Sequence, residues 1–162
     1  MKLNTANVTA YQSLIEEKLC KGEIVLNVIK DPTILLVDEP TFGIVNNRIF
    51  HNGTLSVKVY SKFLKDAPEF ARGFIGLAFR INEDKSKFEL IYLRPANGRC
   101  EDQVRRNHTV QYVSYPNHKF DALRKTEPEK YESYVDIGME EWIDLKLVIQ
   151  DDHAYVYVNQ SK

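Results

Sequence analysis

Arginine is concentrated in one segment of the chain, Arg94–Tyr112. Four of the eight arginines of the chain lie inside this segment, in a stretch of thirteen residues. No lysine lies between Lys87 and Lys119. A solvated basic surface normally mixes the two cations, whereas the planar guanidinium with its five donors suits directed hydrogen bonds to oxygen-rich groups. The segment is therefore the leading candidate for a ligand site.

The residues in and just after this segment suit the recognition of a sugar. Hydroxyl groups need planar donors and acceptors, and the apolar side of a sugar ring packs on an aromatic side chain. The arginines outnumber Glu101 and Asp102, which favours a carboxylated or phosphorylated sugar. The alternative is that salt bridges, such as Asp102 to Arg105, only hold a long loop together. The candidate ligand-binding residues are Arg94, Asn97, Arg99, Asp102, Gln103, Arg105, Arg106, Asn107, His108, Tyr112, Tyr131 and Tyr134.

Three residues are candidates for catalysis: Glu132, Asp102 and His108. A glycosidase needs two carboxyl groups about 5.5 Å apart for retention, or up to about 9.5 Å for inversion. Glu132 and Asp136 share a predicted strand face, but over four residues their backbone positions differ by roughly 13 Å, which is too wide. Glu132 could instead work with Asp102, and His108 could act as a general base near neutral pH. The alternative for a lone histidine is a structural hydrogen bond.

Length and composition predict one soluble, folded domain. The chain has 162 residues, of which 43% are hydrophobic and 28% charged, as in globular proteins. A net charge of −1 gives no global field to attract a polyanion, so nucleic-acid binding, with Tyr112 and Tyr115 as stacking faces, ranks third. No signal-peptide core or membrane span is recognised, which predicts no membrane attachment and a cytoplasmic location by default.

No cofactor is predicted. Cys20 and Cys100 lack metal-ligand spacing and form no Cys-x-x-Cys motif, so free thiols are expected. Cys100 has no accompanying nucleophile signature and is assigned no role. The polar turn with Asn82 and Asp84 could offer oxygens to Ca²⁺, but it falls short of the six to eight ligands that this ion takes.

The N-terminal residues 1–22 have the pattern of a short helix. Thr9–Gln12 has the spacing of a capping box, apolar residues from Tyr11 to Leu19 recur at helical intervals, and Gly22 is a helix stop. Residues 23–162 are instead expected to form a β-sandwich.

Alternating apolar residues and turn signals predict many strands after residue 22. Asn52-Gly53 should join two of them as a hairpin, and Asp151-Asp152 should join another two. Arg80 is expected opposite Glu89. Many short strands with little helix indicate an all-β fold, a two-sheet antiparallel β-sandwich with a short N-terminal helix. The predicted strands are Glu23–Ile29, Thr33–Val37, Asn47–Phe50, Thr54–Tyr60, Ala71–Ile81, Lys87–Arg94, Ile143–Ile149 and His153–Val158.

Several runs of residues also resemble a known superfamily. They are Ala71–Arg80, Tyr92–Arg99, Asp102–His108, Lys130–Tyr134 and Glu141–Val158. The sequence is similar to a poorly characterised branch of the concanavalin A-like lectin/glucanase superfamily, with a LamG-like jelly roll, over about residues 42–158. The resemblance implies two antiparallel sheets and kinship with domains that bind or cleave sugars, including those likened to 3-keto-disaccharide hydrolases.

Two departures from that superfamily matter. Relatives are expected to continue past Tyr155–Val158 with a glycine-rich segment and a closing strand, whereas this chain stops at Lys162. The sandwich is therefore expected to lack a final strand. Two explanations fit this expectation: the chain is part of a longer protein, or the open sheet edge pairs with a second copy in a homodimer. The second departure is that members of the superfamily are usually secreted, whereas no signal peptide is recognised in this sequence.

The resulting functional hypothesis is a carbohydrate-binding jelly roll that recognises a polar or acidic sugar, or another polar small molecule, through the arginine-rich loop. The first alternative is a glycoside hydrolase or lyase of the same fold. The second is a structural or interaction domain that works through its open sheet edge.

Overall fold

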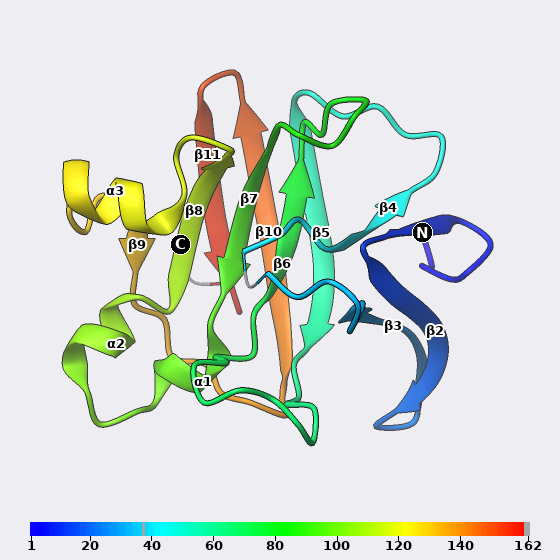
Figure 1. Ribbon diagram of the computed structural model, residues 1–162, viewed down its shortest axis with the longest axis horizontal. Coiled ribbons are helices and arrows are strands. Elements are labelled where there is room, and N and C mark those ends of the chain that lie inside the picture. Colours follow the sequence, from blue (N-terminus) through cyan, green and yellow to red (C-terminus); the bar gives the residue numbers. More distant parts are fainter. Residues whose placement is uncertain (37, 161–162) are drawn as a thin grey trace. The chain divides into compact units, whose positions relative to one another are not determined.

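The structure is a computed structural model that describes residues 1–36 and 38–160, and it is mostly β with several antiparallel sheets, as predicted. The chain falls into two compact units, Met1–Ile49 and Phe50–Lys162. Each unit has sheets of its own (Figure 1).

The first unit contains two antiparallel strand pairs. One pair joins β1 with β4, and the other is the hairpin of β2 and β3. The bounds are β1 Val8–Tyr11, β2 Ser13–Cys20, β3 Glu23–Lys30 and β4 Phe42–Val45.

The predicted N-terminal helix is wrong, because β1 and β2 occupy that region. Lys21 and Gly22 both have positive φ, 48° and 87°, which is the requirement of a two-residue hairpin turn. Gly22 is thus a turn residue and not a helix stop. The apolar residues that suggested a helix meet across the strands instead, as in the pair Ile15 and Val28.

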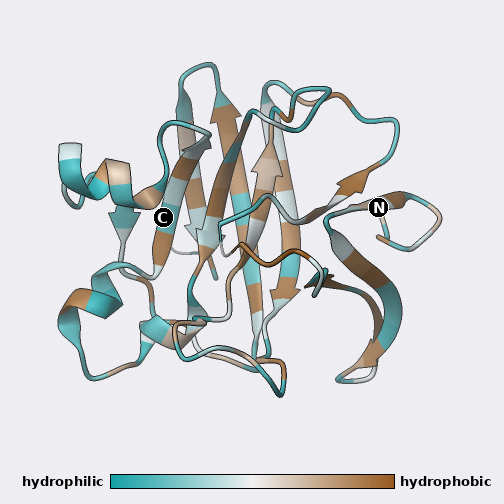
Figure 2. Cartoon of the chain, in the orientation of Figure 1, coloured by the Kyte–Doolittle hydropathy of each residue, from teal (hydrophilic) through white to brown (hydrophobic). Residues whose placement is uncertain are grey.

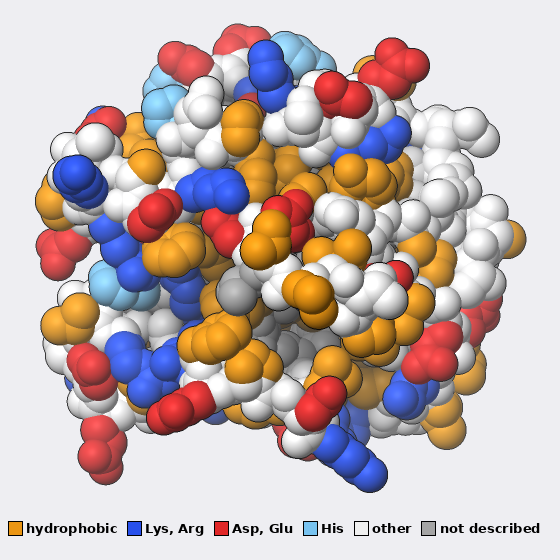
Figure 3. Space-filling model, in the orientation of Figure 1, with side chains coloured by type: hydrophobic (Ala, Val, Ile, Leu, Met, Phe, Trp, Pro, Cys, Tyr) orange, Lys and Arg blue, Asp and Glu red, His pale blue; other side chains and the backbone are white. Residues whose placement is uncertain are grey.

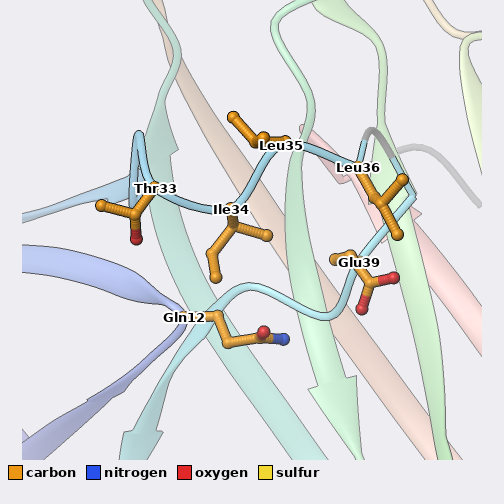
Figure 4. A pocket seen from close by; sticks show the side chains of 6 residues that line it. All are labelled: Gln12, Thr33, Ile34, Leu35, Leu36 and Glu39. Carbon is orange, nitrogen blue, oxygen red and sulfur yellow. The ribbon is translucent and has the colours of Figure 1, made fainter.

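Two predicted strands of this region are also absent from the described residues. Thr33–Leu36 forms no strand, and Val37 lies outside the described residues; Asn47–Phe50 forms no strand either. Thr33–Leu36 lines an open pocket together with Gln12 and Glu39 (Figure 4). The amide of Gln12 already donates to Pro40 O at 2.8 Å, so the pocket offers few polar groups to a ligand.

The second unit contains a three-stranded sheet, in the order β11-β10-β5, and a four-stranded sheet, in the order β6-β7-β8-β9 (Figure 1). All neighbouring strands are antiparallel. The strands are β5 Gly53–Tyr60, β6 Ile75–Phe79, β7 Phe88–Leu93, β8 Val110–Tyr115, β9 Glu132–Ser133, β10 Trp142–Gln150 and β11 His153–Val158.

Three short helices accompany the four-stranded sheet: α1 Pro95–Gly98, α2 Gln103–Asn107 and α3 Phe120–Thr126. Figure 1 places α2 and α3 on the side of β8 and β9. Figure 2 shows that these two helices are largely hydrophilic, whereas hydrophobic residues concentrate on the strands.

A shared hydrophobic core joins the two sheets of this unit. The predicted alternation on β10 is confirmed, because Ile143, Leu145, Leu147 and Ile149 are all buried. They form one cluster with buried residues of the other sheet, such as Leu93. This arrangement is compatible with a β-sandwich.

The hairpin of β10 and β11 is confirmed, with Gln150 opposite His153 across the Asp151-Asp152 turn. The hairpin predicted at Asn52-Gly53 is wrong, because β5 pairs with β10 and not with the residues before it. A turn dipeptide alone therefore did not identify the partner strand.

The register of β6 and β7 differs by one residue from the prediction. Phe79 lies opposite Glu89, where Arg80 was expected. Arg80 has a φ of 51° and leaves the ladder, but its guanidinium still reaches Glu89 at 2.8 Å. Gly76 on β6 is required by packing, since a Cβ there would lie 2.2 Å from Ile91 O.

Candidate functional site

Most of the arginine-rich segment forms α1, α2 and the turns around them. Asp102 is the N-cap of α2, where its carboxylate accepts hydrogen bonds from the backbone N–H groups of Val104 and Arg105 at 2.9 and 3.2 Å. Asp102 therefore caps the start of a helix.

Arg106 fastens the turn before α2. Its guanidinium donates to the carbonyl oxygens of Cys100 and Glu101 at 2.5 and 3.0 Å, and to Gln103 Oε1 at 2.5 Å. The Gln103 amide in turn donates to Asn107 Oδ1 at 2.7 Å. These three candidate ligand-binding side chains are hydrogen-bonded to their own segment.

Arg99 fastens a different loop. It donates to Asp136 at 2.6 Å and to both oxygens of Glu141, at 2.8 and 3.2 Å. The hydrogen bond from Arg99 lowers the pKa of the Glu141 carboxyl, and the same contact raises the pKa of Arg99. The Arg99 side chain is about half exposed, so these ion pairs contribute little to stability.

Arg105 and Asn97 contact each other between α2 and α1. The distance from Arg105 Nη2 to Asn97 Oδ1 is 3.4 Å, and Asn97 is buried. Within residues 1–36 and 38–160, the buried Nε group of Arg105 has no acceptor. This contact therefore also joins two residues of the arginine-rich segment to each other.

Arg94 differs from the other arginines because it is buried just before α1. It donates to His108 O and Tyr92 Oη, both at 2.8 Å, and to Gln111 Oε1 at 3.2 Å. Burial lowers the pKa of Arg94. A guanidinium in this position needs a counter-charge.

The counter-charge is Glu132 on β9, whose side chain is only 3% exposed. Arg94 Nη1 lies 3.5 Å from Oε1, and Arg124 Nε on α3 lies 3.0 and 2.9 Å from the two oxygens. Arg124 Nη2 also donates to Oε1. His108 Nε2 lies 3.4 Å from Oε2. We call Arg94, His108, Arg124 and Glu132 the Glu132 cluster.

The Glu132 cluster has a surplus of positive charge. Burial lowers the pKa of His108, as do Arg124 and Arg94, against the opposing effect of Glu132. At neutral pH the imidazole is therefore neutral, and two guanidinium groups face one carboxylate. The accessible parts belong to Arg124 and His108, whose side chains are 35% and 18% exposed.

Aromatic rings surround the guanidinium of Arg94. Its Cζ lies 4.8, 5.8 and 6.0 Å from the ring centroids of Tyr92, Phe120 and Phe74, within the range of cation–π contacts. Phe74 is 54% exposed. On the side that carries α2 and α3, Figure 3 shows basic side chains next to hydrophobic ones. The cluster thus combines a polar centre with an accessible ring.

The predicted tyrosines do not join this cluster. Tyr112 packs against the core between the sheets, where its hydroxyl donates to Glu89 at 2.9 Å. Burial, followed by this hydrogen bond, raises the pKa of Tyr112 to about 12. Tyr131 packs against Tyr112 with ring centroids 5.6 Å apart, and Tyr134 is exposed.

Sequence reasoning missed Arg124 and the rings of Phe74, Tyr92 and Phe120. A weak signal was available, because Phe120 and Arg124 are four residues apart and share a helix face. Their ring and guanidinium are 5.2 Å apart. Nothing in the sequence linked that face to Glu132.

In residues 1–36 and 38–160, no three His, Cys, Asp or Glu side chains are grouped to hold a metal ion. In the turn considered for Ca²⁺, the Asp84 carboxylate accepts from Ser86 N and Oγ at 2.9 and 2.6 Å. These bonds lower the pKa of Asp84. Both cysteines are free. No described helix has the length and apolar character to cross a membrane.

No family model, curated protein or solved structure matches the chain. The resemblance to the concanavalin A-like superfamily therefore stays a prediction.

Proposed function

We propose that the protein binds a polar or acidic sugar at the Glu132 cluster, with Phe74 as the surface for the sugar ring. The observation that carries this proposal is the pair of guanidinium groups on a single, nearly fully buried carboxylate. The site predicted from sequence was the arginine-rich segment Arg94–Tyr112 together with Tyr131 and Tyr134. Arg99 and Arg106 already use their guanidinium groups in hydrogen bonds that hold their loops. The Glu132 cluster is therefore the better candidate for the binding site.

The chemistry of the accessible groups supports an anionic or hydroxylated ligand. Among the described residues, Nη1 of Arg124 has no acceptor, while Nε and Nη2 of the same guanidinium are held by Glu132. A guanidinium positioned in this way loses little further entropy when it binds a carboxylate. The exposed ring of Phe74 adds an apolar surface. An acidic sugar could use both.

The test begins with a glycan array that includes neutral and uronic-acid oligosaccharides, followed by calorimetric titration of the best ligand. We expect retention of acidic members by the wild-type protein. Arg124→Lys keeps the charge but removes the planar fork, so the affinity should fall about tenfold or more.

Lys125→Met is the matched control, because Lys125 is the exposed neighbour of Arg124 on the same helix. Its affinity should match that of the wild type. No retained glycan, or equal affinities for the wild type and Arg124→Lys, would remove the proposal.

A second candidate function, a sugar hydrolase or lyase, is favoured by the contact of His108 with Glu132 at 3.4 Å. In the neutral ring, a proton on Nε2 would face Glu132 and leave Nδ1 as the proton acceptor. His108 is then the general base, and Glu132 is a positioning residue that is too enclosed to reach a substrate itself.

Catalysis predicts that the wild-type protein shortens a uronic-acid oligosaccharide that it binds, measured by chromatography of the products. His108→Gln should slow this reaction by a factor of about 100 or more with the affinity largely kept. An intact oligosaccharide after long incubation with the wild type would leave binding as the function.

A further inference from the structure

We propose that His108 sets the charge preference of the Glu132 cluster. While its imidazole is neutral it accepts a hydrogen bond from a sugar hydroxyl, and once protonated it donates one to a sugar carboxylate. This inference rests on the proposed sugar site and adds which kind of sugar the site prefers at which pH. The affinity for an acidic sugar should therefore rise as the pH falls.

The two ring nitrogens of His108 have different surroundings. Nε2 lies 3.4 Å from Glu132 Oε2, whereas Nδ1 has no hydrogen-bond partner within residues 1–36 and 38–160. In that part of the chain, Arg105 Nε is the only enclosed side-chain nitrogen or oxygen without a partner, so Nδ1 of His108 is accessible to water. With the proton of the neutral ring on Nε2, facing the carboxylate, Nδ1 carries a lone pair. A sugar hydroxyl can donate to this lone pair, but a sugar carboxylate cannot.

Protonation reverses the role of Nδ1. The imidazolium has two N–H donors, so Nε2 can still face Glu132 while Nδ1 donates to the ligand. The cluster gains one positive charge at the same time, and three cationic groups then surround one carboxylate. A hydrogen bond between charged partners is roughly twice as strong as one between neutral partners. An acidic sugar therefore gains from the proton, and a neutral sugar does not.

The charged groups that face His108 decide where the change occurs. Glu132 on β9 and Glu129, which follows α3, favour the protonated ring. Arg124 on α3 and Arg94 before α1 oppose it. Burial is the largest effect and, together with the two arginines, lowers the pKa of His108. A carboxylate bound beside the two guanidinium groups would offset their effect, so the ligand and the proton each favour binding of the other.

A matched pair of ligands tests this preference. Trigalacturonate carries carboxylates, whereas its methyl ester has the same sugars without the charge. Calorimetric titration at pH 8 and pH 5 measures both affinities, and a sugar carboxylate is ionised at both values. From pH 8 to pH 5 the dissociation constant of trigalacturonate should fall about fivefold or more. That of the ester should not fall, because a hydroxyl group loses its acceptor when the ring is protonated.

Two histidine variants separate this effect from a general change in the charge of the protein. His108→Gln cannot titrate, so its affinity for trigalacturonate should change by less than about twofold between the two pH values. His153→Gln is the matched control, because the side chain of His153 is 69% exposed and lies on β11 in the other sheet. This variant should keep the full response of the wild type.

NMR titration of the His108 imidazole in the wild-type protein tests the same coupling without a substitution. Because binding linkage is reciprocal, saturating trigalacturonate should raise the pKa of His108, and the methyl ester should not. Binding of trigalacturonate with equal affinity at both pH values would overturn the inference and leave the sugar site in place. An equal response of the ester, or a full response of His108→Gln, would overturn it as well. No binding at either pH would remove the sugar site and this inference together.

Discussion

Replacing Glu132 with glutamine should lower the free energy of unfolding by about 3–5 kcal/mol. The neutral amide would leave the guanidinium of Arg94, whose side chain is only 6% exposed, beside a second guanidinium with no opposite charge between them. Removing one partner of a buried ion pair is costly because the remaining charge stays desolvated. Equilibrium unfolding in urea measures the change.

Glu127→Gln is the matched control, since Glu127 forms an ion pair with Lys130 in which both side chains are largely exposed. The same chemical change there should cost no more than about 1 kcal/mol. Equal costs for the two variants would mean that the Glu132 cluster is not electrostatically significant.

The Glu132 cluster has a structural role that is coupled to its proposed role in binding. β9 contains only two residues, Glu132 and Ser133, and in the described part of the chain it pairs with β8 alone. Few ladder hydrogen bonds hold it, so the ion pairs to Arg94 and Arg124 also position the strand. Variants of the binding site are therefore best made at Arg124, the most exposed member, where binding can change with the smallest loss of stability.

The strands with one buried face could be predicted from the sequence. On β10 every second residue from Ile143 to Ile149 is buried, and that period follows from the geometry of a strand whose single face meets the core. In the first unit the period was ambiguous. Leu14, Ile15 and Leu19 fit a helix as well as a strand, and the outcome depended on the positive φ of Lys21 and Gly22.

The candidate site could be predicted only in part, because the fate of an arginine depends on residues far away in the chain. Arg94 and Arg99 belong to the same run, but Arg94 meets Glu132 in a buried cluster whereas Arg99 meets Glu141 at the surface. Composition marked the segment correctly as rich in directed hydrogen bonds. Those bonds mostly close its own turns, and only the fold reveals that Arg124 and Phe74 lie beside Arg94.

Leu147→Ala should be similarly destabilising, by about 2–5 kcal/mol. Leu147 is 0% exposed and lies at the centre of the three-stranded sheet, opposite Leu55 on one side and Val156 on the other. Its removal leaves a cavity against the other sheet, because strands held by ladders on both sides cannot collapse into the space. Urea unfolding, followed by tryptophan fluorescence, measures the loss.

Leu64→Ala makes the same chemical change at a side chain of the same unit that is about half exposed. It should cost less than about 1 kcal/mol, since a partly solvated leucine leaves no enclosed cavity. The difference between the two variants measures how tightly the two sheets share one core. If Leu147→Ala cost no more than Leu64→Ala, the sheets would not be packed against each other as a sandwich requires, and the face that carries Glu132 would lose its rigid support.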